Sequence, residues 1–130
     1  MKLPARISIA TSSGLHPFLE TNVDLPARKK ETFSTFEDQQ QIIEIHLVYG
    51  DNAIAFDNIT IAKFAVGDLP SMPRAKPRIE IDISIDANML LTAGVKVHQT
   101  GKSEVVKNVD LAAIKPPEVK HRVEYVTEQH

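Results

Sequence analysis

Residues 33–50 read FSTFEDQQQIIEIHLVYG and combine the features that decide the fold. After a polar loop, Ile43, Ile45 and Leu47 alternate with Glu44 and His46. This period of two is typical of a half-buried strand, because successive side chains of a strand point to opposite faces. Two phenylalanines, three positions apart, precede the loop. A strand, a polar loop and a return strand with large apolar side chains predict the lip of an apolar groove.

The composition indicates one ordinary globular domain. The 130 residues are 42% hydrophobic and 25% charged, with a net charge of −2 and an isoelectric point near 6.2. This balance gives no electrostatic footprint for nucleic acid or an anionic membrane. The sequence has no cysteine, no apolar run of transmembrane length and no signal-peptide core at its start. We therefore expect a cytoplasmic protein that binds neither nucleic acid nor a membrane.

Short alternating segments recur along the chain and predict an all-β fold. The clearest is RIEIDISI at 78–85, where four isoleucines alternate with polar residues. Gly94 inside the next segment indicates a bulge. Strands at such regular spacing are typical of an antiparallel β-sandwich, here of about eight strands. The strands are expected at 6–10, 15–20, 27–35, 43–49, 59–66, 78–85, 89–98 and 103–109.

The two prolines at 116–117 mark the expected end of the sandwich. We divide the chain into a β-domain over 1–115 and a segment over 116–130. Val119, Val123 and Val126 fall on one face of a helix that would begin at Pro117. A helix this short is marginal without packing partners. The segment is therefore either a short tail or the start of a truncated helix.

The chemistry-bearing residues form no catalytic or metal-binding pattern. The five histidines are scattered, without an i, i+4 pair or a zinc motif. Ser12 and Ser13 beside Gly14 lack the strand-to-helix elbow of hydrolases. We therefore expect a binding protein that is not an enzyme.

Several motifs in fixed order resemble one protein family. They are NVDLP at 22–26, FSTFEDQQ at 33–40, LPSMPR at 69–74, PRIEI at 77–81, DAN at 86–88 and TGK at 100–102. Together, over residues 4–113, they resemble the peptide-binding β-domain of the seventy-kilodalton heat-shock chaperones of the DnaK type. Phe36 is similar to the residue found in the branch that serves iron–sulfur cluster assembly, the HscA-like chaperones.

This resemblance implies a molecular chaperone that holds an extended hydrophobic peptide between the first two loops of the sandwich. One aliphatic side chain of the peptide would enter a central pocket whose floor Ile79 closes. Phe36, with Thr11 or Ser12, would flank the peptide as an arch, and Gln40 would offer its amide to a peptide carbonyl. The implied peptide-binding residues are Ile7, Ile9, Thr11, Ser12, Phe33, Ser34, Phe36, Gln40, Ile43, Ile45 and Ile79.

The implied partners follow from the same resemblance. They are unfolded or extended hydrophobic peptides, a nucleotide-binding domain and co-chaperones. The resemblance covers no nucleotide-binding domain, so ATP would act only through such a domain outside this sequence, and no cofactor is expected here. Residues 116–120, PPEVK, resemble a peptide that the iron–sulfur branch binds. The tail is thus either an inert linker or a segment that mediates self-association through a neighbour's groove.

One departure from the family supports a different function. The loop at 11–14 is about one residue shorter than in the family and lacks the side chain that reaches across the peptide. The alternative is therefore a structural or adaptor β-sandwich that keeps the fold, has lost the groove and binds a fixed protein partner.

Overall fold

The structure is a computed structural model that describes residues 1–11, 14–35 and 37–119, with the backbone alone for 104–107. The described residues form eight strands and two single-turn 3-10 helices. The strands are β1 (Ile7–Thr11), β2 (Gly14–Leu19), β3 (Ala27–Phe33), β4 (Ile43–Tyr49), β5 (Ile59–Val66), β6 (Ile79–Ile85), β7 (Leu90–Val97) and β8 (Ser103–Asp110). The helices are η1 (Ala55–Asp57) and η2 (Leu111–Ala113).

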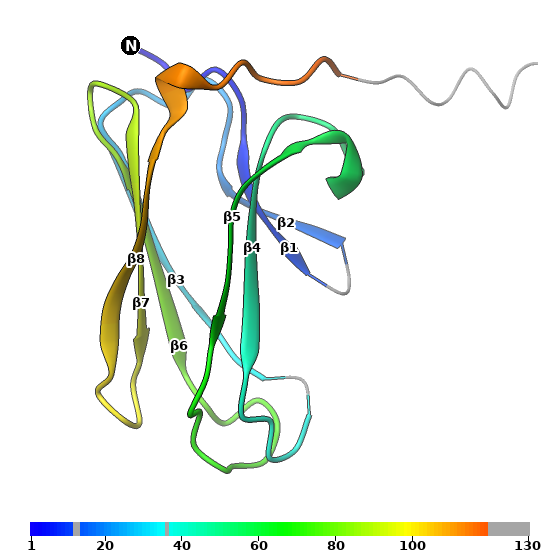
Figure 1. Cartoon of the computed structure of the whole chain (residues 1–130), viewed down its shortest axis with the longest axis vertical. Helices are drawn as coiled ribbons and strands as arrows, with labels where there is room; N and C mark the ends of the chain where they lie inside the picture. Colours follow the sequence, from blue (N-terminus) through cyan, green and yellow to red (C-terminus); the bar gives the residue numbers. More distant parts are fainter. Residues whose placement is uncertain (12–13, 36, 120–130) are drawn as a thin grey trace, which may run out of the picture.

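The strands make two four-stranded antiparallel sheets packed against each other (Figure 1). One sheet has the order β2-β1-β4-β5, and the other has the order β3-β6-β7-β8. The prediction of an antiparallel β-sandwich of about eight strands is confirmed. The expected bulge is also present, because the β7–β8 register shifts between Ala93 and Gly94.

The core lies between the sheets, and β6 shows how the sequence places it. Ile79, Ile81, Ile83 and Ile85 are fully buried, while the residues between them stay partly exposed. Strand alternation sends all four isoleucines to the same face. Burying each side chain contributes roughly 1.5–3 kcal/mol. The opposing sheet adds side chains such as Leu47, which is also fully buried.

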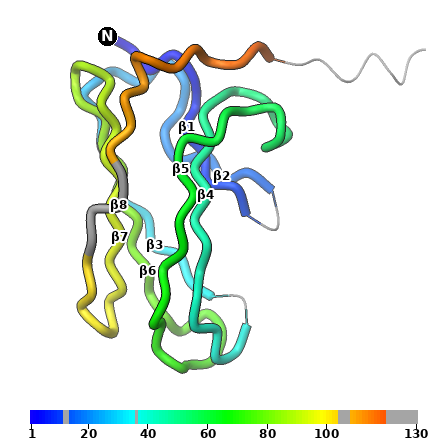
Figure 2. The backbone as a smooth tube through the Cα atoms, in the orientation of Figure 1, coloured from blue at the N-terminus to red at the C-terminus, as the bar shows by residue number. Residues whose placement is uncertain are grey.

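The chain leaves η2 and crosses the end of the sandwich toward the β4–β5 connection (Figure 2). There the side-chain amide of Asn52 donates to the carbonyl of Glu118, with 2.9 Å between Nδ2 and O. Pro117 packs beside Gly50. The described part of the predicted tail, through Val119, therefore lies against its own sandwich. The helix expected near the end of the sequence falls mostly on 120–130, outside the described residues.

Tyr49, at the end of β4, gives a prediction for stability at alkaline pH. The residue is buried, and its hydroxyl has no hydrogen-bond partner among the described residues. Burial, and then the charge of Asp51, raises the pKa of Tyr49 above its ordinary value of 10.0. Near pH 10 the unfolded chain thus loses this proton more readily than the folded one. The contribution of Tyr49 to stability is present below that pH and is lost as pH rises through the folded-state pKa.

We expect Tyr49→Phe to be at least as stable as the wild type near neutral pH, because it removes a buried, unpaired hydroxyl. Its free energy of unfolding should fall less steeply than that of the wild type as the pH rises through about 10. Urea unfolding of both proteins across this range measures the difference. Groups common to both proteins cancel in the comparison. Parallel curves would contradict the role assigned to Tyr49.

Candidate functional site

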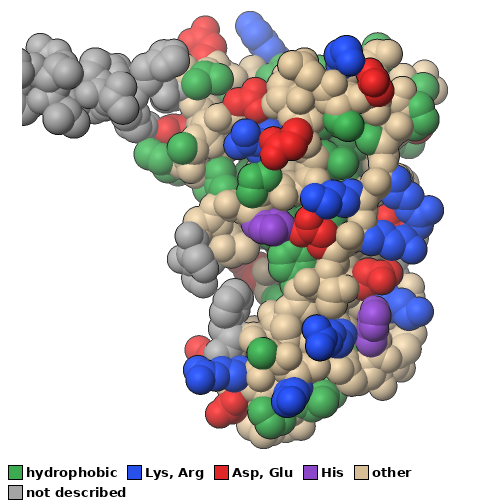
Figure 3. All heavy atoms as spheres, turned by 180° about the vertical axis from the view of Figure 1, so that it is seen from behind, with side chains coloured by type: hydrophobic (Ala, Val, Ile, Leu, Met, Phe, Trp, Pro, Cys, Tyr) green, Lys and Arg blue, Asp and Glu red, His purple; other side chains and the backbone are tan. Residues whose placement is uncertain are grey.

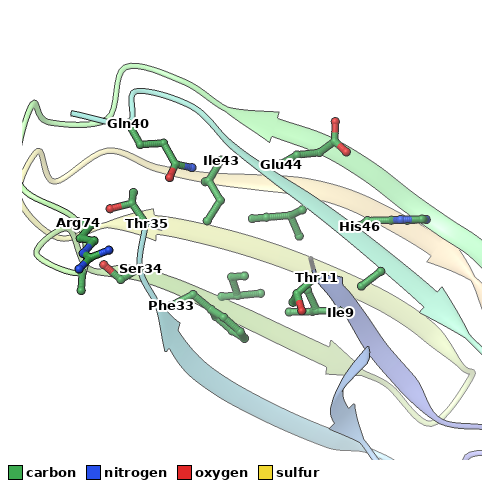
Figure 4. Close-up of a pocket in the computed structure, with 14 residues that line it drawn as sticks. Ile9, Thr11, Phe33, Ser34, Thr35, Gln40, Ile43, Glu44, His46 and Arg74 are labelled. Atoms are coloured by element: carbon green, nitrogen blue, oxygen red, sulfur yellow. The ribbon is translucent and has the colours of Figure 1, made fainter. Parts of the chain in front are cut away.

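A large apolar cavity opens at the end of the sandwich where β1 and β3 end and β4 begins (Figure 4). Its volume is about 880 Å³. Figure 4 shows Phe33 and Ile43 directed into the space from two different strands. The lining residues are Ile9, Ala10, Thr11, Phe33, Ser34, Thr35, Gln40, Ile43, Glu44, Ile45, His46, Arg74, Ala75 and Ile81.

The strand register explains why a cavity forms here. β1 pairs with β4 from Ile7 opposite Tyr49 to Ile9 opposite Leu47, and the described ladder ends there. β4 continues back to Ile43, paired with β5 on its other side. The segment 43–46 therefore runs beside the cavity without a β1 partner in the described ladder. A strand edge beside an apolar space is where an extended chain can add by backbone hydrogen bonds.

The floor and walls are aliphatic and aromatic. Ile9 and Ile45 are almost fully buried, at 4% and 1% exposure, and form the deep part. Phe33 and Ile43 are half-buried and stand nearer to the opening. This gradient from buried to half-buried side chains suits one apolar group that enters from outside and loses its contact with water.

The rim beside β3 is polar and is fixed by hydrogen bonds between two connections. The backbone N of Arg74 donates to Asp38 Oδ1 at 2.9 Å. The backbone N of Ala75 donates to the carbonyl of Thr35 at 3.1 Å. These bonds hold the β5–β6 connection against the β3–β4 connection, so this wall of the cavity is already formed.

The rim beside β4 carries ionisable groups with modest partners. Glu44 Oε1 lies 3.7 Å from Lys63 Nζ. His46 Nε2 lies 2.7 Å from the hydroxyl oxygen of Thr60. Neither pair is buried. No group of three or more potential metal ligands occurs in the described residues.

Gln40 is engaged within its own connection. Its Nε2 donates to the carbonyl of Ile42 at 2.8 Å, and its Oε1 accepts from the backbone N of Glu37 at 3.2 Å. Because the side-chain amide nitrogen carries two hydrogens, the expected bond from Gln40 to a peptide carbonyl is compatible with its bond to Ile42.

The structure brings most of the expected peptide-binding residues to this cavity. Ser12 and Phe36, the expected arch residues, lie outside the described residues. The expected residues that line the cavity are Ile9, Thr11, Phe33, Ser34, Gln40, Ile43 and Ile45.

Two expected residues, Ile7 and Ile79, are not among the residues that line the cavity. Ile7 and Ile79 are fully buried in the core, and Ile81 lies under the opening instead. Residues two apart on a strand share a face, so alternation identifies the inward face without saying which residue lies under an opening. Ile7 also precedes the end of the β1–β4 ladder, where the two strands are still paired.

Other lining residues were not expected. Ala10, Thr35, Glu44 and His46 are neighbours of expected residues, and this adjacency was the available signal. Arg74 and Ala75 come from the β5–β6 connection, where the LPSMPR motif was the available signal.

The fold and the cavity together define the class of this protein. It is an all-β sandwich with an apolar cavity at one end. A model of the Hsp70 protein family matches residues 3–129, nearly the whole sequence, and the chain therefore belongs to the Hsp70 family. This membership supports a chaperone-related role. No helix within the described ranges has the length and apolar character needed to cross a membrane.

Proposed function

We propose that this chain is a DnaK-type substrate-binding β-domain that holds extended hydrophobic peptide segments in the cavity. One observation carries the proposal: the β1–β4 ladder ends at Ile9 and Leu47, and β4 continues along an apolar cavity. The backbone of an added peptide would bond to the exposed strand edge, largely independently of its sequence. An aliphatic side chain of the peptide would occupy the space between Phe33 and Ile43.

The magnitudes support a weak, exchangeable complex. Burial of one leucine side chain contributes about 1.5–3 kcal/mol. Each backbone hydrogen bond adds roughly 1 kcal/mol net. Ordering the peptide offsets part of both contributions. The proposed affinity is then about micromolar, near −8 kcal/mol.

The proposed activity is binding without ATP hydrolysis by this chain. Coupling to ATP would come from a nucleotide-binding domain in the same or an associated protein, with co-chaperones as further partners. The proposed compartment is the cytoplasm.

Titration of a labelled, capped peptide with one central leucine tests the proposal. Fluorescence anisotropy should show saturable binding with a dissociation constant in roughly the micromolar range. The same peptide with serine in place of leucine should bind at least tenfold more weakly, since the apolar burial is lost. Absence of binding to any apolar peptide would contradict the proposal and leave the adaptor function.

A further inference from the structure

One polar group in the cavity wall is buried without a partner. Thr35, just after β3, is only 5% exposed and lines the cavity. Its hydroxyl oxygen is buried and makes no hydrogen bond within the described residues. Ser8 and Tyr49 also have buried hydroxyls of this kind, but neither residue lines the cavity. An unpaired buried hydroxyl is costly to keep, so its place in the wall of a cavity indicates that a ligand supplies the partner.

A guanidinium without an ionic partner belongs to the same wall. Arg74 is exposed and lines the cavity. The carboxylate of Asp38 accepts the backbone N of Arg74 at 2.9 Å, and no carboxylate of the described residues forms an ion pair with the guanidinium. The next residue, Ala75, is bonded through its backbone N to the carbonyl of Thr35 at 3.1 Å. This bond holds the backbones that carry the guanidinium and the unpaired hydroxyl against each other.

The two sides of the cavity differ in charge. Figure 4 shows Arg74 beside Ser34 on one side and Glu44 on the other. Glu44 has a basic neighbour, Lys63, at 3.7 Å. Seen from behind, the lower end of the molecule, where the β5–β6 connection lies, carries several basic side chains (Figure 3). A negative group on a bound peptide is therefore favoured beside Arg74 and disfavoured beside Glu44.

We propose that the guanidinium of Arg74 and the hydroxyl of Thr35 form a subsite for a carboxylate, so that the preferred ligand is an extended apolar peptide with a carboxylate close to its buried aliphatic side chain. The inference rests on the proposed function, because the subsite belongs to the same cavity. A guanidinium donates two parallel N–H groups to a carboxylate, and a hydroxyl donates one more hydrogen bond. The peptide's C-terminus and an aspartate or glutamate side chain both offer this chemistry.

Fluorescence anisotropy with a set of labelled peptides tests the subsite. The reference peptide has one central leucine with glutamine on each side, and both of its ends are capped. Two further peptides replace one glutamine or the other by glutamate, and a fourth keeps both glutamines but ends in a free carboxylate. At least one acidic peptide should bind the wild type about three- to tenfold more tightly than the reference. The gain should shrink at about 1 M salt, which screens the charges. A gain from glutamate identifies a side-chain carboxylate, and a gain from the free end identifies a terminal one.

Two substitutions assign the gain to the proposed groups. Arg74→Gln should bring the ratio of the two affinities, acidic peptide to reference, close to one. Arg74→Lys should keep part of the ratio, since an ammonium retains the charge but lacks the planar fork. Thr35→Val keeps the shape of the side chain and removes the hydroxyl, so it should lower the ratio about two- to threefold. Because that hydroxyl is unpaired, folded Thr35→Val should resist urea at least as well as the wild type.

Arg78→Gln is the matched control. Arg78 is exposed, and its backbone N donates to Gln99 Oε1 at 3.0 Å, much as the backbone N of Arg74 donates to Asp38. Arg78 does not line the cavity. Arg78→Gln therefore removes the same charge from the same connection and should keep the wild-type ratio. An equal loss in Arg78→Gln and Arg74→Gln would overturn the subsite, because the net charge alone would then explain the preference.

The reference peptide separates the subsite from the proposed function. If the wild type binds the acidic peptides and the reference equally well, the subsite is wrong and the proposed function is intact. A ratio that persists in Arg74→Gln would also overturn the subsite. If the wild type binds none of the peptides, both the subsite and the proposed function are wrong.

Discussion

Ile43→Phe is expected to weaken peptide binding at least tenfold while the protein remains folded. Ile43 is half-buried on the cavity wall at the start of β4. The larger ring would occupy space that the peptide's aliphatic side chain needs. Losing the burial of that side chain removes about 1.5–3 kcal/mol, equivalent to roughly a ten- to hundredfold change in the dissociation constant. The opening beside Ile43 lets the ring be accommodated without overpacking the core.

The adjacent residue supplies the control for this variant. Ile42 is 60% exposed and does not line the cavity, so Ile42→Phe makes the same chemical change one position away. Peptide titration of both variants should show the loss in Ile43→Phe alone. Urea unfolding of both confirms that the comparison is between folded proteins. Equal affinities of the two variants would show that the peptide binds elsewhere.

The fold was predictable because its strands carry strong local signals. The four alternating isoleucines of β6 predict a half-buried strand, and all four are buried. Gly94 predicted the β7 bulge, where the pairing with β8 shifts. These features depend on residues near one another in sequence, and strand alternation expresses them directly.

The site was predictable only in part, because it is assembled from segments distant in sequence. The resemblance placed residues of β1, β3 and β4 at one cavity, including Ile9, Phe33 and Ile43, and the structure brings them together. Alternation could not choose between Ile79 and Ile81, which share a face. The place of Arg74 depends on a hydrogen bond from its backbone to Asp38, 36 residues away in sequence. The contact between His16 and Glu31 likewise requires the three-dimensional approach of β2 and β3, which are edge strands of different sheets.

Gly50→Ala is expected to be strongly destabilising, lowering the free energy of unfolding by about 3 kcal/mol or more. Gly50 has a φ of +146°, which L-residues rarely adopt. A Cβ there would lie 2.2 Å from Asn58 Oδ1 and 2.7 Å from Pro117 Cγ. Asn58 cannot move freely, because it bonds to both the backbone N and the carbonyl of buried Asn52, at 3.0 and 2.9 Å.

Urea unfolding of Gly50→Ala beside Gly67→Ala separates this local clash from the general effect of removing a glycine. A Cβ on Gly67 would meet nothing within 4 Å, and its φ is not in the left-handed region, so stability should change by no more than about 0.5 kcal/mol. β4 spans the seven residues Ile43–Tyr49, about 20 Å of strand, and Gly50 follows it, so folded Gly50→Ala should keep its peptide affinity. Ile43→Phe should show the converse, weak binding with near-normal stability. If Gly50→Ala weakened peptide binding as strongly as Ile43→Phe, the two ends of the sandwich would be coupled. That result would contradict the view that the cavity forms independently of the β4–β5 connection, which contains Asn52.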